Sequence, residues 1–297
     1  MDCNELILLL VFLTSRYTTF GQSFRSREMI NSHLSYFFDT KLISCIFAVK
    51  LYNLYIEMDH PVKRFLKRGK NMKVKDKLSL DYNGLVKYGA VNIVAFGDSV
   101  THGAVGPDEI DYDSCYWNRL RKKLNDYKSY VPVNVINSGI GGITATDSLE
   151  RLERDVFSHH PDLVIICFGL NDVNGSLESF ISSLEKIFRQ CNERQIEAVY
   201  MTPNMLNTYV SDDTVEELKS YAAVTAEIQN SGRMDEYMNA AVELAGKMEI
   251  KVCDCYKKWK ELSKNEDITM LLANRINHPV REMHELFAQS LFDIIMN

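Results

Sequence analysis

The chain has 297 residues, of which 46% are hydrophobic and 25% charged, and its formal net charge is -6. This composition is typical of a globular protein with one sizeable core or two small ones. The negative charge argues against nucleic acid as a partner, because a surface that binds phosphates needs clustered Lys and Arg. The seven cysteines are odd in number and scattered, unlike a small disulfide scaffold, so we expect most of them to be buried thiols.

The beginning of the chain differs from the remainder, and the sequence predicts two parts. Residues 1–75 are interpreted as an N-terminal extension that is doubtful or poorly ordered, and residues 76–297 as the main domain; whether residues 1–57 belong to the native protein is left open. The apolar run from Leu6 to Leu13 has the length of a signal-peptide core, but acidic residues precede it and it is too short to span a bilayer. We therefore expect a start at Met58, a cytoplasmic location and no membrane partner. If the run is a genuine signal, the protein is secreted or membrane-anchored.

From about residue 88, short hydrophobic runs alternate with amphipathic stretches. The runs are typical of buried strands and cover 91–96, 133–137, 163–168, 198–202 and 250–253. Apolar residues at helical spacing predict helices at 149–156, 177–188 and 283–294. This alternation predicts a parallel sheet covered by helices on both faces, and ligands of such sheets bind beyond the carboxyl ends of the strands.

Small polar turns follow three of the predicted strands. Gly97-Asp98-Ser99 follows the first, the segment Asn137 to Thr144 the second, and Gly169-Leu170-Asn171-Asp172 the third. Taken singly, each is an ordinary turn or helix cap. The glycines of the second segment do not complete a dinucleotide loop, because Thr144 stands where the last glycine belongs. A serine is a good nucleophile only beside a base and oxyanion donors, so Ser99 needs partners from elsewhere.

A histidine suited to act as a base lies near the C-terminus, in Asn277-His278-Pro279. The proline fits the first turn of a helix, here expected to begin near Val280, which places His278 on the loop just before it. Four other histidines are expected to be surface or packed side chains: His102, His159, His160 and His284.

In their order along the chain, these four segments resemble the four blocks of the SGNH (GDSL) hydrolase family, over about residues 90–297. The resemblance implies a flavodoxin-like α/β fold of three layers, α/β/α, with a mostly parallel, five-stranded sheet. It also implies that Ser99 is the nucleophile and His278 the base. The implied oxyanion hole consists of the backbone N–H groups of Ser99 and Gly142 and the side chain of Asn171. Three donors from separate loops can surround one developing oxyanion without moving.

The chain departs from the family at one position. Family members usually have an aspartate three residues before the histidine, where it orients the imidazole, and this chain has Arg275 there. We interpret the site as a Ser–His dyad in which another group orients the ring: the side chain of Asn274, Asp267 folding back, or a backbone carbonyl of the Asn274 to Asn277 turn. A cation beside the base would oppose its protonation, so the guanidinium is expected to point away or to pair with an acid.

The function implied by the resemblance is that of a serine esterase working through an acyl-enzyme, with no metal and no organic cofactor. The expected substrates are small-molecule or oligosaccharide esters, acetyl groups on carbohydrate foremost. No long apolar lid is visible beside the serine, and the segment 106–117 brings acids and aromatics near it. A lysophospholipase or acyl-thioesterase on the same site is the alternative, followed by a non-catalytic sugar-binding relative. The oligomeric state is left open.

Overall fold

The computed structural model describes residues 72–106 and 109–297. The chain divides into two compact units, Met1–Arg68 and Gly69–Asn297, and the described residues all belong to the second. Most of the predicted extension, with the apolar run and the expected start at Met58, lies outside the described residues. Among the described helices, none combines the length and the apolar character needed to cross a bilayer.

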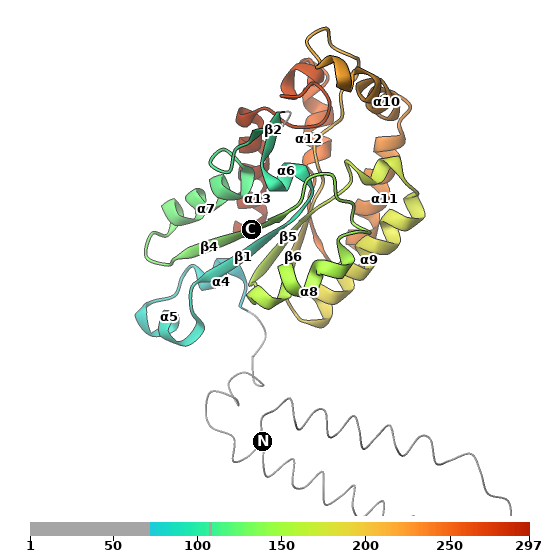
Figure 1. Ribbon diagram of the computed structural model, residues 1–297. Helices are drawn as coiled ribbons and strands as arrows, with labels where there is room; N and C mark the ends of the chain where they lie inside the picture. The colour runs from blue at the N-terminus through green and yellow to red at the C-terminus, as the bar shows by residue number, and fades with distance from the viewer. Residues whose placement is uncertain (1–71, 107–108) are drawn as a thin grey trace, which may run out of the picture. The chain divides into compact units, whose positions relative to one another are not determined.

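The centre of this unit is a five-stranded parallel sheet in the order β4-β1-β5-β6-β7 (Figure 1). Its strands are β1 (Val91–Gly97), β4 (Val133–Gly139), β5 (Leu163–Cys167), β6 (Glu197–Met201) and β7 (Lys251–Cys253). All five predicted strands are therefore confirmed, with bounds that differ by one or two residues. The residues of β5 are buried without exception, as their continuous apolar run predicts for a strand covered on both faces.

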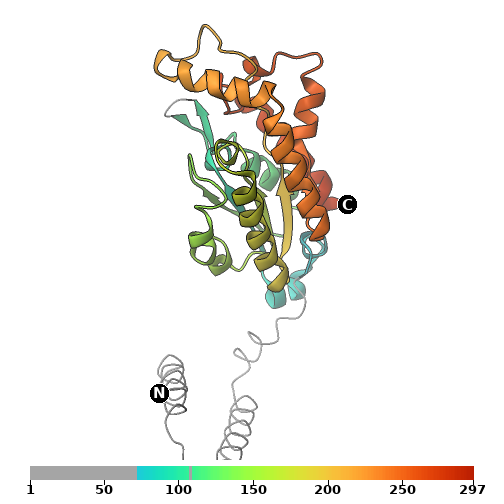
Figure 2. The same ribbon diagram turned by 90° about the vertical axis from the view of Figure 1, so that its right-hand side faces the viewer.

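The helices are α4 (Val74–Lys77), α5 (Tyr82–Tyr88), α6 (Ser99–His102), α7 (Tyr116–Tyr127), α8 (Leu152–Asp155), α9 (Leu177–Glu193), α10 (Lys219–Asn230), α11 (Arg233–Lys247), α12 (Cys255–Leu262) and α13 (His284–Met296). On one side of the sheet α7 packs against α13, and α8 and α9 lie on the other side (Figure 1). Both views place α9 and α11 side by side (Figure 1 and Figure 2). The predicted α/β class, with helices flanking a parallel sheet, is confirmed.

Two predicted helices begin differently from the prediction. The stretch 149–156 forms a 3-10 turn, Leu149–Arg151, before the short α8. The helix expected near Val280 starts as a 3-10 turn at Arg281–Met283 and becomes α-helical at His284. Helical spacing of apolar residues does not distinguish these tighter turns from an α-helix, because both present one face to the core.

The register of the central strands decides where their loops lie. Gly97 at the end of β1 pairs with Gly139 of β4 and with Cys167 of β5. The three strands therefore end level with one another, and the loops that follow them meet at one edge of the sheet. That edge carries all three of the polar turns noted in the sequence.

A small antiparallel pair of strands, β2 (Ala104–Gly106) and β3 (Glu109–Ile110), follows α6 and was not predicted. Strands of two or three residues are too short for an alternating pattern. The expected burial of thiols is confirmed for the five cysteines of the described residues, which are buried and free: Cys115, Cys167, Cys191, Cys253 and Cys255.

Candidate active site

Ser99 and His278 are 179 positions apart in the sequence and in hydrogen-bond contact in the fold. The distance from Nε2 of His278 to Oγ of Ser99 is 3.0 Å. Ser99 is the first residue of α6, immediately after β1, and His278 lies on the loop that precedes the 3-10 turn Arg281–Met283. The structure thus brings together the two residues that the sequence suggested as nucleophile and base.

The turn at Ser99 is held by its neighbours on both sides. The carboxylate of Asp98 accepts a hydrogen bond from the N–H of Val100 at 3.0 Å and so caps α6. The hydroxyl of Thr101 is 2.9 Å from that of Tyr116 on α7. As the first residue of a helix, Ser99 has a backbone N–H without an intrahelical acceptor. That N–H can serve an oxyanion.

The loop after β4 runs directly beside the serine. An added Cβ at Gly139 would overlap the backbone of Thr101 and His102, so only glycine lets this loop lie against α6. A Cβ built on Gly141 would lie 4.0 Å from Cβ of Ser99. Gly142, the next residue, has a φ of +76° and open space where its side chain would be. Gly142 is exposed, so its backbone is not covered by other parts of the described chain.

Asn171, at the end of the β5 loop, is tied to the same loop. Its Nδ2 donates a hydrogen bond to the carbonyl of Ile143 at 3.0 Å. A side-chain amide has two N–H donors, so one remains for a ligand while the other fixes the side chain. The candidate oxyanion donors from α6, the β4 loop and the β5 loop accordingly arise from adjacent segments.

The side chains proposed as orienters of the imidazole are hydrogen bonded elsewhere. Oδ1 of Asn274 accepts from the backbone N–H groups of Ile276, Asn277 and His278, each at 3.0 Å. It therefore shapes the loop and holds the backbone of His278, not its ring. Asp267 is exposed, accepts from the N–H of Thr269 at 3.0 Å and from the hydroxyl of Tyr209 at 2.7 Å, and caps a different turn.

Arg275 points away from the imidazole, as expected. Its guanidinium pairs with Asp213 at 2.9 Å and donates to the carbonyls of Leu272 and Met270 at 2.8 and 3.2 Å. Its backbone has a φ of 59°, in the left-handed region. The hydrogen bonds of Arg275 thus stabilise the turn. Its charge is compensated by Asp213, which is not part of the Ser99–His278 contact.

The imidazole of His278 is half-buried beside Ser99. Its Nδ1 is buried and makes no hydrogen bond of standard geometry within the described residues, although the backbone of Gly106 is close enough to act on the ring as an acceptor. Burial lowers the pKa of His278 from 6.5 to about 4, and the backbone carbonyl of Gly106 acts less strongly in the opposite direction. The ring is therefore neutral near pH 7 and can accept a proton, but within 72–106 and 109–297 no carboxylate is hydrogen bonded to it to stabilise the imidazolium that results.

This pKa leads to a prediction for the pH dependence of turnover. A base must be neutral to accept the serine proton, and a pKa lowered to about 4 keeps the ring neutral down to about pH 5. We expect kcat/KM for p-nitrophenyl acetate to be level above pH 5 and to fall to half near pH 4. Circular dichroism at each pH separates protonation from unfolding. An acid limb centred at or above pH 6.5 that persists in folded Asp98→Asn, which removes the neighbouring carboxyl group of pKa about 7, would contradict the assignment.

Two buried carboxyl groups lie under the loops of the site and were not singled out from the sequence. Burial, with a smaller effect from the charge of Asp172, raises the pKa of Asp98 to about 7. Burial raises the pKa of Asp172 to about 6, and its Oδ1 accepts from the N–H of Ala145 at 2.9 Å, which links the β5 and β4 loops. Both residues belong to the polar turns that follow strands, and this position in the sequence could have identified them as residues of the site.

A second imidazole, that of His102, lies beside the loop after β4. His102 lies three residues after Ser99, and its Nδ1 would be 3.8 Å from a Cβ built on Gly141. The ring of Tyr112 faces it with centroids 6.3 Å apart. His102 is half-buried. Because residues three apart lie on the same face of a helix, its spacing from Ser99 could have predicted that it lies near the serine. Within 72–106 and 109–297, no group of three or more His, Cys, Asp or Glu side chains is arranged to hold a metal ion.

Comparison with known proteins agrees with this fold. Residues 95–286 match the model of the GDSL-like Lipase/Acylhydrolase family. Among solved structures, an acetylxylan esterase from Geobacillus stearothermophilus is similar at 20% identity and a TM-score of 0.55, over 69% of this chain and 94% of that one. A lipase/acylhydrolase from Enterococcus faecalis is similar at 24% identity and a TM-score of 0.53, over 69% and 95%.

A curated relative matches a shorter stretch. The "Uncharacterized lipoprotein YqeF" of Bacillus subtilis (strain 168) is 34% identical over 86 residues, which are 28% of this chain and 33% of the relative. The chain thus matches about a third of that relative's length. The family model, in contrast, covers most of the described domain, from the last residues of β1 to the first residues of α13. This chain therefore belongs to the GDSL-like lipase/acylhydrolase family, whose members hydrolyse ester bonds.

Proposed function

We propose that the protein is a serine esterase that removes small acyl groups, acetyl foremost, from carbohydrate, with Ser99 as nucleophile and His278 as base. The observation that carries this proposal is the 3.0 Å contact between Oγ of Ser99 and Nε2 of His278 at the carboxyl edge of the sheet. Membership of an acylhydrolase family supports the same chemistry.

The reaction follows from the groups present. Nε2 of His278 takes the proton of Ser99 as Oγ attacks the ester carbonyl, and the N–H groups of Ser99 and Gly142 with Nδ2 of Asn171 stabilise the tetrahedral oxyanion. Collapse of this intermediate expels the alcohol, which receives the proton from His278. Water, deprotonated by the same imidazole, then attacks the acyl-enzyme and releases the acid and free Ser99. Each oxyanion donor is expected to stabilise the transition state by about 3 kcal/mol.

Two side-chain rings beside the β4 loop support the carbohydrate part of the proposal. His102 and Tyr112 place two rings with polar edges beside the β4 loop, and flat rings with polar tips suit sugar rings and their hydroxyl groups. The structurally similar protein from Geobacillus stearothermophilus is named an acetylxylan esterase. An apolar feature favours the alternative: Ile140, in the loop beside Ser99, has 41% of its surface exposed.

A series of acyl chain lengths distinguishes the two. With p-nitrophenyl esters from acetate to decanoate, we expect kcat/KM to be highest for acetate and to fall by about tenfold or more along the series, and acetylated xylo-oligosaccharides to be deacetylated. Each added methylene changes binding by up to about 1 kcal/mol, so a small acyl pocket gives a clear trend. Activity that rises toward decanoate would replace this proposal by a lysophospholipase or acyl-thioesterase.

Location is a separate part of the proposal. We propose a cytoplasmic enzyme, because acidic residues precede the apolar run of the N-terminal region where a signal peptide is positively charged. The relative named a lipoprotein favours the alternative of an exported, anchored enzyme. Fractionation of cells that express the full chain decides between them: recovery in the membrane or medium would overturn the cytoplasmic proposal.

A further inference from the structure

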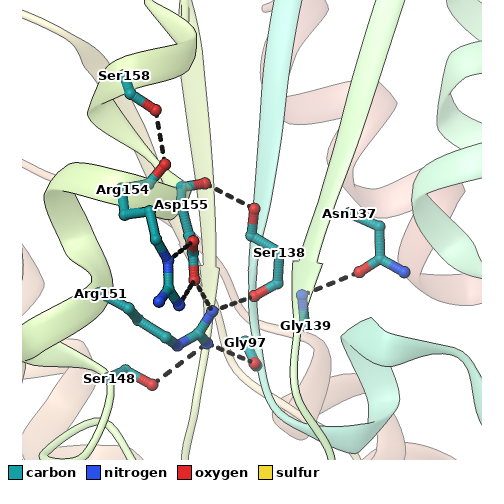
Figure 3. Close-up of polar contacts among 9 residues, drawn as sticks. All are labelled: Gly97, Asn137, Ser138, Gly139, Ser148, Arg151, Arg154, Asp155 and Ser158. Atoms are coloured by element: carbon teal, nitrogen blue, oxygen red, sulfur yellow. Dashed lines mark hydrogen bonds and ion pairs between the residues drawn. The ribbon is translucent and has the colours of Figure 1, made fainter.

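A buried arginine lies behind the two loops that carry the candidate nucleophile and an oxyanion donor. Arg151 precedes α8, and 6% of its surface is exposed. Figure 3 shows its guanidinium beside the ends of β1 and β4, hydrogen bonded to a backbone carbonyl of each strand. Nothing in the sequence pattern distinguished it from the neighbouring charged residues of the same helical stretch.

Its contacts join two backbones. Nη1 donates to the carbonyl of Ser138 at 2.7 Å, and Nη2 donates to the carbonyl of Gly97 at 3.3 Å (Figure 3). Gly97 is two residues before Ser99, and Ser138 is four residues before Gly142. The carbonyl of Gly97 also accepts from the N–H of Ile140 at 3.1 Å, so the two strand ends are cross-linked at this point.

The guanidinium is itself fixed from three directions. Oγ of Ser148 lies 3.3 Å from Nη2, the carboxylate of Asp155 lies 3.4 Å from Nη1, and the ring of Phe96 lies under the guanidinium at 4.4 Å. Asp155 makes shorter contacts, of 2.6 and 2.9 Å, with the exposed Arg154. Arg151 therefore has little freedom to move, and its shortest hydrogen bond is to the carbonyl of Ser138 at the end of β4.

A buried arginine is an unfavourable choice if its only role is to stabilise the fold. Burial lowers the pKa of Arg151, which means that its charge is held in a poorly solvated place. Its Nε is also buried without a partner among the described residues. An apolar side chain of similar volume often stabilises such a position as well as a buried ion pair does. What an apolar side chain cannot do is bind two carbonyls at once with a rigid, planar group.

We propose that Arg151 is a positioning residue for ester hydrolysis. It holds the ends of β1 and β4 at a fixed separation, and through them the hydroxyl of Ser99 and the N–H of Gly142 in the geometry that the oxyanion requires. This rests on the proposed roles of Ser99 and Gly142. Misplacement of reacting groups by about 1 Å costs about 100-fold in rate, which sets the scale of the expected effect.

The test compares Arg151→Gln, Arg151→Lys and a matched control, Arg154→Gln, which removes a cation from the same carboxylate of Asp155 without touching a strand. With p-nitrophenyl acetate, well below each variant's melting temperature, we expect Arg151→Gln to lower kcat by about 100-fold with KM changed less than about threefold. Arg151→Lys, which can reach one carbonyl but not both, is expected to recover part of this loss. Arg154→Gln is expected to stay within about twofold of the wild type.

A second measurement separates positioning from stability. The rate at which a fluorophosphonate labels Ser99 in folded protein should fall with kcat in the Arg151 variants and stay unchanged in Arg154→Gln. A lower melting temperature with unchanged kcat and labelling rate would overturn the proposal and leave Arg151 a purely structural residue. If Arg151→Gln does not fold, Arg151→Lys decides on the same two readouts.

Ser99→Ala tests the underlying function. Activity that survives in Ser99→Ala refutes the proposed function. Loss of activity in Ser99→Ala, together with unchanged activity in the Arg151 variants, refutes only this inference.

Discussion

Replacement of Ser99 or His278 by alanine is expected to lower kcat for p-nitrophenyl acetate by about 10⁴-fold or more. Ser99→Ala removes the atom that forms the acyl-enzyme, and His278→Ala removes the base that lies 3.0 Å from it. Because the two groups act as one unit, the double variant should be no worse than either single variant. Initial rates over a range of substrate concentrations, with KM determined for each variant, measure this.

Ser158→Ala and His159→Ala are suitable controls, since both side chains are exposed and lie outside the site. They should keep wild-type kcat. A non-catalytic sugar-binding protein would show no turnover to lose, and that outcome would refute the esterase. Turnover that persists in Ser99→Ala at more than about a tenth of the wild-type rate would show that the nucleophile is another group.

Asn171→Ala is expected to lower kcat by about 10²- to 10³-fold with a small change in KM, because the donor acts on charge that develops only in the transition state. Asn171→Asp should be at least as severe, since a carboxylate would repel the oxyanion. The side chain is held in place by its hydrogen bond to the carbonyl of Ile143 at 3.0 Å. Steady-state kinetics with the acetate ester and a melting curve for each variant give the two quantities needed.

Asn192→Ala provides the matched control for this experiment. Its Nδ2 also donates to a backbone carbonyl, that of Met248 at 2.9 Å, far along the chain from the site. The loss of such a bond is expected to cost about 1 kcal/mol of stability and leave kcat unchanged. Equal kcat values for Asn171→Ala and Asn192→Ala would show that Asn171 has only a structural role.

The base of this site is expected to be weaker than one in a complete triad. With its pKa lowered to about 4, His278 is available over a wide pH range but has a low affinity for the proton it must accept. Among the residues that the structure describes, no carboxylate is hydrogen bonded to Nδ1 of the ring, and Asn274 and Asp267 are bonded elsewhere. The low pKa of His278 is the expected cause of both the level pH profile and a modest kcat.

The sequence predicts those parts of the fold and site that depend on local pattern. The five strands carry continuous apolar runs, and the turns with Ser99, Gly142 and Asn171 follow three of them, so their common edge follows from parallel pairing. Helices α10 to α12 were not predicted, and the hairpin of β2 and β3 is too short to show a pattern.

The surroundings of His278 depend on contacts that no local pattern records. Asn274 could have faced the ring or the backbone, and three converging N–H groups fix it on the backbone. Arg275 occupies the usual place of the acid, and its pairing with Asp213, 62 positions away, can be seen only in the fold. The same holds for Arg151, whose two carbonyl partners come from different strands.

Covalent labelling by a fluorophosphonate, followed by peptide mapping, tests the central claim most directly. The Ser99–His278 contact predicts a single stoichiometric adduct on Ser99, lost in Ser99→Ala, slowed strongly in His278→Ala and accompanied by loss of esterase activity in proportion to labelling. Hydrolysis of acetyl esters by protein that carries no adduct on Ser99, or an adduct on another serine that tracks the loss of activity, would contradict it.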